Sequence, residues 1–261
     1  MARQQFDLIV FDWDGTLMDS TPTIAKCIQL ASRDLGLPVP DDSAASHVIG
    51  LGLKDALSYA VPTLDPVDYP RLAERYRYHF LTRDADLVLF DGVREMLETL
   101  RAEHYFLGVA TGKTRVGLQR SLAASGLTAL FDATRCADET FSKPHPAMLH
   151  ELTRELGQDV ERTVMIGDTT HDLQMAANAG AKGLGVCYGA HPAESLRQFD
   201  RGPDRVAAGP CLRPPPARRR CGCAPPMHCR RADSACASRW RSSGARSALS
   251  WCASMALRMP T

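Results

Sequence analysis

From residue 91 to residue 199, short apolar runs alternate with segments of helical periodicity, and this alternation constrains the fold more than any other feature. Apolar runs typical of strands occur at residues 105–110, 163–166 and 183–188, with helix-like segments between them. Strands that are joined by helices pair in parallel, and the helices then cover both faces of the sheet. The run at residues 7–11 indicates one more buried strand. We therefore predict an α/β fold with an open, doubly wound parallel sheet.

Residues 18–87 interrupt this pattern, because they show helical periodicity throughout. We expect helices at about residues 22–35, 43–59 and 66–82, with Pro62 and Pro66 separating the last two. The segment follows the first predicted strand directly and precedes all the others. The sequence therefore predicts a core made of residues 1–17 and 88–200, with residues 18–87 inserted as an α-helical unit.

The composition changes at about residue 201. Residues 201–261 contain twelve Arg, no Lys and two acidic residues, whereas residues 1–200 hold 19 basic and 28 acidic residues. Six of the nine Cys and eight of the 17 Pro also lie in this last segment. We interpret this atypical, Arg-, Pro- and Cys-rich tail as an out-of-frame translation of the true terminus. The alternatives are a basic disordered arm for nucleic acid, or a metal-binding knuckle built from Cys221, Cys223, His228 and Cys229.

Several classes of protein are disfavoured by the rest of the sequence. The cysteines are not arranged as a disulfide framework, which is typical of a protein from the reducing cytoplasm. The N-terminus lacks the apolar run of a signal peptide, and no stretch of about 18 apolar residues could span a membrane. We therefore expect a cytoplasmic protein without a membrane partner.

Polar side chains follow three of the predicted strands at the point where each strand ends. Asp12 and Asp14 come after the first strand, Thr111 after the second and Asp168 after the third, with Asp172 one helical turn further on. Each Asp alone could be a turn former or a helix N-cap. However, ligands bind open α/β sheets at the carboxyl ends of their strands, so these groups should converge. Converging carboxylates repel one another, and an all-oxygen set of ligands favours a hard cation such as Mg²⁺.

The order of these residues indicates phosphoryl transfer. Asp12 could attack an electrophile as a nucleophile, and Asp14 could protonate the leaving group and later activate water. Thr111 and the N–H of Gly112 are suited to a phosphoryl oxygen, and Lys143 could neutralise charge on the phosphoryl group and on Asp12. Lys143 could instead be a solvated loop lysine. Its place in a Ser-Lys-Pro-His-Pro loop, in a segment with only five Lys, favours the functional role.

Four sequence motifs resemble those of the haloacid dehalogenase-like (HAD) superfamily of phosphohydrolases. They are Asp-Trp-Asp-Gly-Thr-Leu at residues 12–17, Thr111, Lys143-Pro144, and Gly-Asp-Thr-Thr-His-Asp at residues 167–172. The resemblance covers residues 6 to about 199. It implies a Rossmann-like core with a helical cap inserted after the first motif. It also implies Mg²⁺ held by Asp12, Asp168 and the backbone carbonyl of Asp14, with Asp172 in support.

Within that superfamily, Asp14 resembles the second acid of phosphatases, which dehalogenases and phosphonoacetaldehyde hydrolases lack. The cap type and residues 91–93 look like the phosphoglycolate phosphatase-like branch. The resemblance implies a Mg²⁺-dependent phosphomonoester hydrolase that acts on a small phosphometabolite, such as phosphoglycolate, through an aspartyl phosphate. A β-phosphoglucomutase-like phosphomutase and a non-catalytic binding protein acting through the basic tail are the alternatives.

The glycine-rich loop at residues 47–54 is a candidate for substrate selection. A flexible loop that carries a cation could close over an anionic substrate, and Lys54 could pair with the carboxylate of phosphoglycolate. Lys54 could equally be a surface residue of a helix. We expect His47 and His171 to be neighbours of the site rather than metal ligands. We expect a small phosphorylated metabolite, and not nucleic acid, as the partner, and the oligomeric state is left open.

Overall fold

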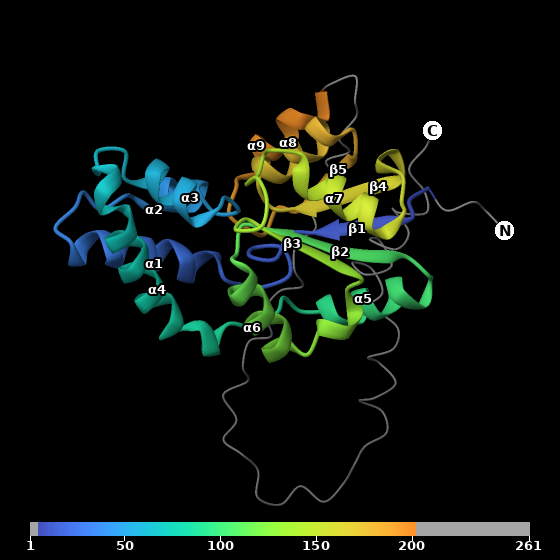
Figure 1. The fold of residues 1–261 in the computed structure, drawn as a ribbon, viewed down its shortest axis with the longest axis horizontal. Coiled ribbons are helices and arrows are strands. Elements are labelled where there is room, and N and C mark those ends of the chain that lie inside the picture. The colour runs from blue at the N-terminus through green and yellow to red at the C-terminus, as the bar shows by residue number, and fades with distance from the viewer. Residues whose placement is uncertain (1–4, 202–261) are drawn as a thin grey trace, which may run out of the picture.

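The fold is built on a five-stranded parallel sheet with the strand order β3-β2-β1-β4-β5 (Figure 1). The structure, a computed structural model, describes residues 5–201. The strands are β1 Leu8–Phe11, β2 Phe106–Thr111, β3 Ala133–Cys136, β4 Thr163–Gly167 and β5 Lys182–Gly185. This arrangement confirms the predicted α/β fold, and β1 lies at the centre of the sheet because the chain crosses over on either side of it.

Helices cover both faces of the sheet (Figure 1). Alternate residues of β1 enter different apolar clusters: Ile9 and Phe11 pack with α5 Val93–Ala102 and α6 Arg115–Ser125. Leu8 and Val10 pack on the opposite face with α7 Ala147–Leu156 and α8 Thr170–Ala179. A strand that is buried on both faces must be apolar throughout, which explains the uninterrupted run of β1.

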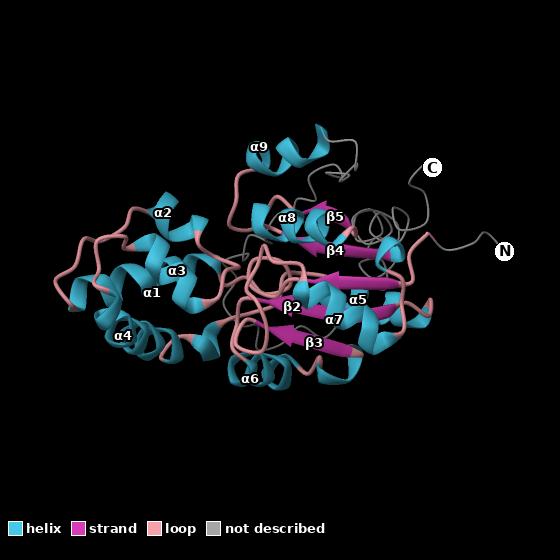
Figure 2. Cartoon of the chain, turned by 45° about the horizontal axis from the view of Figure 1, so that its top comes forward, coloured by secondary structure: helices cyan, strands magenta, loops and turns pink. Residues whose placement is uncertain are grey.

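The helices between β1 and α5 form a separate body, which we call the helical insertion. It contains α1 Thr21–Asp34, α2 Asp42–His47, α3 Leu53–Ala60 and α4 Tyr69–Leu81. They enclose an apolar cluster of their own, which includes Ile28, Leu57 and Leu72. In Figure 2 the strands point with their carboxyl ends toward this insertion, so the ends of the strands and the insertion face each other.

The boundaries of the elements differ from the prediction in one informative place. The single helix expected at residues 43–59 is two helices, α2 and α3, because Gly50 between them has a φ of +92°. That left-handed conformation cannot continue an α-helix. The core ends with α9 Ala193–Leu196, followed by a 3-10 turn, Arg197–Arg201. The remaining 3-10 turns are Pro66–Asp68, Asp84–Asp86, Thr128–Leu130 and Val160–Arg162.

The atypical tail lies outside the described residues from residue 202 onward, and so do its three interpretations. Among the residues that the structure describes, no helix has the length and apolar character needed to cross a membrane.

Candidate active site

Three buried carboxylates meet where β1 and β4 end. Asp12 follows β1 and Asp168 follows the neighbouring strand β4, while Asp172 lies in the first turn of α8. Asp172 is fixed by a capping box, in which its Oδ2 accepts hydrogen bonds from the N–H (3.1 Å) and the hydroxyl (2.7 Å) of Thr169. One carboxylate oxygen from each of Asp12, Asp168 and Asp172 lies within 4.8 Å of the others. The structure thus brings together the three carboxylates that the sequence placed at one crevice.

Lys143 reaches this cluster from the loop between β3 and α7. Its ammonium nitrogen lies 2.8 Å from Asp12 Oδ1 and 2.7 Å from Asp172 Oδ1, and its side chain is fully buried. Burial by itself lowers the pKa of Lys143, but the charges of Asp12 and Asp172 outweigh it and raise the pKa above its ordinary value. Lys143 therefore remains a cation, and its alternative as a solvated loop lysine is wrong.

The single ammonium group does not balance three carboxylates. Burial raises the pKa of Asp12 well above its ordinary value, although Lys143 opposes the shift. Burial, and then the charge of Asp172, raises the pKa of Asp168 to about 7. Asp12 Oδ2 is also buried and has no hydrogen-bond partner in the described part of the chain. Excess negative charge, oxygen ligands and an unpartnered oxygen fit a hard divalent cation such as Mg²⁺.

Asp168 is held from two sides by hydrogen bonds. The Thr16 hydroxyl donates to its Oδ1 over 2.9 Å, and the Ala190 N–H donates to its Oδ2 over 2.6 Å. Gly15 must approach this carboxylate closely, because a Cβ at that position would lie 2.2 Å from Asp168 Oδ2, and its φ of +81° also favours glycine. The segment that follows Asp12 in the sequence therefore also positions Asp168, through Gly15 and Thr16.

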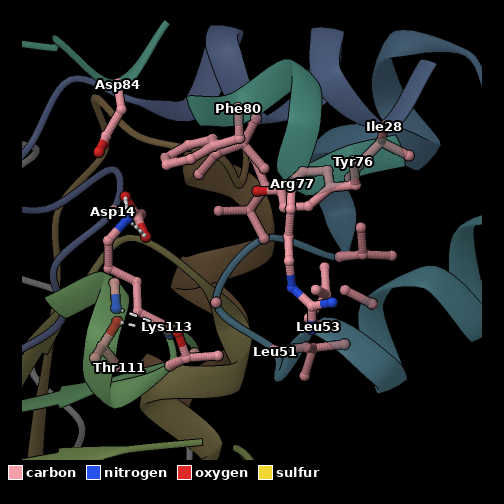
Figure 3. Close-up of a pocket in the computed structure, with 18 of the residues that line it drawn as sticks. Asp14, Ile28, Leu51, Leu53, Tyr76, Arg77, Phe80, Asp84, Thr111 and Lys113 are labelled. Atoms are coloured by element: carbon pink, nitrogen blue, oxygen red, sulfur yellow. Dashed lines mark hydrogen bonds and ion pairs between the residues drawn. The ribbon is translucent and has the colours of Figure 1, made fainter. Parts of the chain in front are cut away.

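Asp14 lies beside the carboxylate cluster but is held by other groups. Both of its carboxylate oxygens accept hydrogen bonds of 3.0 Å from Lys113 (Figure 3). Oδ1 accepts another from the Ser20 hydroxyl over 2.7 Å. Lys113 Nζ also lies 4.9 Å from the centre of the Phe80 ring. The Asp14 side chain is outside the cluster, and the metal contact through its backbone carbonyl stays a prediction. Sequence reasoning missed Lys113, although it follows Thr111 by two residues at a strand end.

The helical insertion is closed on the core through the loop between α2 and α3. The His47 carbonyl accepts hydrogen bonds from His171 Nε2 (3.0 Å) and His191 Nε2 (2.9 Å). The Gly52 N–H donates to the Ser142 hydroxyl over 2.8 Å. A Cβ placed on Gly50 would lie 3.8 Å from Asp12 Oδ2, so this loop lies directly over the carboxylate cluster.

A cavity of about 300 Å³ remains between the insertion and the ends of the strands. Asp12, Asp14, Thr111, Gly112 and Lys113 line it from the core, and mostly apolar side chains line it from the insertion. The predicted binding residue Lys54 is exposed on α3 and is not among the residues that line it. A different cation, Arg77 of α4, takes part in the lining (Figure 3). The structure therefore gives Lys54 no support as a substrate ligand.

Comparison with known families identifies the chain. The family model described as haloacid dehalogenase-like hydrolase matches residues 9–186, which include β2 to β5, β1 except for Leu8, and all three carboxylates of the cluster. The chain belongs to the haloacid dehalogenase-like hydrolases. This membership confirms the resemblance that the four sequence motifs indicated.

Individual members of the haloacid dehalogenase-like family are similar over most of their length. A protein of Dickeya dadantii described as "probable phosphatase IndB" is 38% identical over 73% of this chain and 85% of its own length. A phosphoglycolate phosphatase of Colwellia psychrerythraea is 31% identical over 76% of this chain and 92% of its own. The crystal structure of a "predicted phosphoglycolate phosphatase" from Haemophilus somnus has a TM-score of 0.65 and 29% identity, covering 74% of this chain and 91% of that one.

Proposed function

We propose that this haloacid dehalogenase-like hydrolase is a Mg²⁺-dependent phosphatase that hydrolyses a small phosphomonoester through an aspartyl phosphate. The observation that carries the proposal is the buried contact of Asp12 with Lys143, at the end of the cavity beneath the insertion and within a cluster of two further carboxylates. The phosphatase names of relatives that are 31% to 38% identical support it. Phosphoglycolate is the reference substrate because several of these relatives are named for it.

In the first step, a carboxylate oxygen of Asp12 attacks phosphorus, and the bond between phosphorus and the alcohol oxygen breaks. Asp14 donates a proton to that oxygen as the alcohol leaves. In the second step, Asp14 takes a proton from water, which attacks phosphorus and releases inorganic phosphate and the free Asp12 carboxylate. Thr111 and Gly112 line the same end of the cavity and are placed to hydrogen-bond a phosphoryl oxygen.

Lys143 and the cluster prepare Asp12 for this attack. The Lys143 ammonium group and the backbone N–H of Trp13 fix the Asp12 carboxylate in one orientation. The Trp13 backbone N–H donates to Asp12 Oδ1 over 2.7 Å. Asp12, Asp168 and Asp172 would hold Mg²⁺, and the ion when bound would neutralise charge on the phosphoryl group. The loop over Asp12 excludes bulk water, which strengthens each of these electrostatic interactions.

The experiment is hydrolysis of p-nitrophenyl phosphate by the full chain in Mg²⁺ and in EDTA, for the wild type and for Asp12→Asn. Asp12→Asn keeps the shape of the side chain but removes the nucleophilic charge, so phosphate release should fall to background. Asp55→Asn serves as the matched control, since Asp55 is exposed on α3, and it should retain full activity. Wild-type rates in Asp12→Asn, or full activity in EDTA, would contradict the proposal.

A further inference from the structure

Beyond the phosphoryl end, the cavity is built for an apolar group. From the insertion its wall includes Ile24 and Ile28 of α1, Ile49 of the loop, and the stacked rings of Tyr76 and Phe80 on α4. The two ring centroids are 5.9 Å apart with an interplanar angle of 22°. A leaving group that lies against this wall gains from burial in proportion to its apolar area. The two-carbon acid that phosphoglycolate would release has almost no such area.

Three cationic side chains also line the cavity, and two of them are paired with carboxylates. Lys113 is paired with Asp14, and Arg120 lies 3.3 Å from Asp84. The Arg77 side chain, in contrast, is exposed at the rim of the cavity that it lines, and within the described residues it makes no ion pair or side-chain hydrogen bond. Figure 3 shows its side chain extending from α4 toward Leu51 and Leu53, at the opposite side of the cavity from Asp14. An unpaired guanidinium in this position is suited to an anionic group far from the reacting phosphorus.

We propose that the substrate is the phosphate ester of an alcohol with an apolar body, and that a distal anionic group of this alcohol binds Arg77. The inference rests on the proposed function for the position of the phosphoryl group, and it adds the chemical class of the leaving group. Arg77 is thus a specificity-determining residue. The volume of about 300 Å³ lies at the lower end of the roughly 300–1,000 Å³ found for pockets that enclose small organic ligands. A leaving group much larger than glycolate therefore fits.

The test uses straight-chain alkyl phosphates, because their leaving groups differ in apolar length but hardly in acidity. Ethyl, butyl and hexyl phosphate are compared with the same chains carrying a terminal carboxylate, and with phosphoglycolate. For the wild-type full chain, kcat/KM should rise about fourfold for each added methylene group until the cavity is filled. At the best chain length, the terminal carboxylate should raise kcat/KM by a further factor of about ten. The butyl and hexyl substrates, with or without the carboxylate, should have a higher kcat/KM than phosphoglycolate.

Two arginine variants test whether Arg77 causes the preference for a substrate with a terminal carboxylate. Arg77→Gln should abolish the preference for the carboxylated substrate over the plain one of equal length. Arg71→Gln is the matched control, because Arg71 is exposed on the same helix and does not line the cavity, and it should keep the preference. No rise with chain length, phosphoglycolate as the best substrate, or an unchanged preference in Arg77→Gln would each overturn the proposal.

Failure of this inference can be distinguished from failure of the proposed function. If alkyl phosphates are hydrolysed with dependence on Asp12 but without the two preferences, the phosphatase assignment stands and the substrate class is wrong. If no ester is hydrolysed, titration calorimetry with methylphosphonate, hexylphosphonate and 6-phosphonohexanoate in Mg²⁺ still tests the cavity. Tighter binding of the hexyl compound, with a further gain from the carboxylate that Arg77→Gln removes, supports the inference. Equal affinities overturn it.

Discussion

The ammonium group of Lys143 lies 2.8 Å from Asp12 Oδ1, and neither side chain is more than 1% exposed to solvent. A charge pair that is buried to this degree is costly to desolvate, and removal of one partner leaves the other uncompensated. In this chain the uncompensated charges would be those of Asp12 and Asp172, which share the ammonium group. We therefore expect Lys143 to be required both for the stability of the site and for the proposed chemistry.

Replacement of Lys143 by Met should therefore lower kcat/KM for p-nitrophenyl phosphate by about a hundredfold or more, as expected for loss of a preorganised charge at the reaction centre. Urea unfolding in EDTA at pH 7 should show a loss of about 3 kcal/mol, since a buried charge pair is broken. Lys182→Met, at an exposed position in β5, should change neither quantity. A Lys143→Met variant with wild-type kinetics would remove Lys143 from the mechanism.

The raised pKa of Asp168 makes the stability of the metal-free protein depend on pH. Asp168 titrates at about 7 in the folded chain, against an ordinary value of 3.8 in the unfolded chain. Between these values the folded state holds a proton that the unfolded state has lost, so the free energy of unfolding should fall as pH rises from about 4 to about 7. Denaturant titrations in EDTA across this range should show a smaller fall in Asp168→Asn than in the wild type. An equal slope in both proteins would contradict the shift.

Magnesium should reverse this loss of stability. The ion binds the ionised carboxylates, so it must displace the protons that Asp12 and Asp168 hold at low pH. We therefore expect Mg²⁺ to raise the melting temperature more at pH 8 than at pH 5, as measured by thermal unfolding at fixed free Mg²⁺. A larger increase at pH 5 would show that these carboxylates do not form the metal site.

Lys113 should matter most for substrates whose leaving group needs a proton. It holds both carboxylate oxygens of Asp14 at 3.0 Å, so Lys113→Met should leave the proton donor poorly placed. Hydrolysis of an alkyl phosphate should fall by about a hundredfold, the lower end of the range attributed to general acid catalysis. Hydrolysis of p-nitrophenyl phosphate should fall much less, because p-nitrophenolate leaves without protonation. Equal losses on both esters would argue that Lys113 has another role, and Lys26→Met on the exposed face of α1 provides the control.

The closed position of the insertion depends on the absence of a side chain at Gly112. A Cβ at this position would lie 2.3 Å from the Leu51 carbonyl oxygen and 2.7 Å from that of Gly50. Gly112→Ala should push the loop away from Asp12 and lower kcat/KM by about a hundredfold, since misplacement by about 1 Å can cost that much. Gly108→Ala, within β2, meets no atom closer than 3.4 Å and should be nearly neutral in kcat/KM. Similar kinetics in the two variants would contradict the closed arrangement as the active one.

The sequence predicted the parts of the site that follow from strand topology. Asp12 and Asp168 each come directly after a buried strand, and parallel neighbours bring their carboxyl ends together whatever the intervening chain does. Asp172 lies in the first turn of the helix that follows Asp168, so it is brought to the same edge of the sheet. Lys143 lies on a loop, and it was recognised through its local sequence and the family resemblance.

Contacts between the insertion and the core could not be predicted in this way. The helix expected at residues 43–59 divides at Gly50, which turns Lys54 outward and brings the loop onto Asp12. Arg77 lines the cavity because α4 packs against α1, a tertiary contact with no local signal. The pairing of Lys113 with Asp14 joins residues 99 positions apart, so it too follows from packing rather than from spacing.

The most direct measurement is chemical trapping of the phosphorylated residue. The full chain is mixed with substrate in Mg²⁺, quenched in acid and treated with borohydride, which reduces an aspartyl phosphate to homoserine. Peptide mass spectrometry should then find homoserine at position 12, and it should be absent when Mg²⁺ or substrate is left out. Normal turnover with unmodified Asp12, or homoserine at position 168 instead, would contradict the central claim.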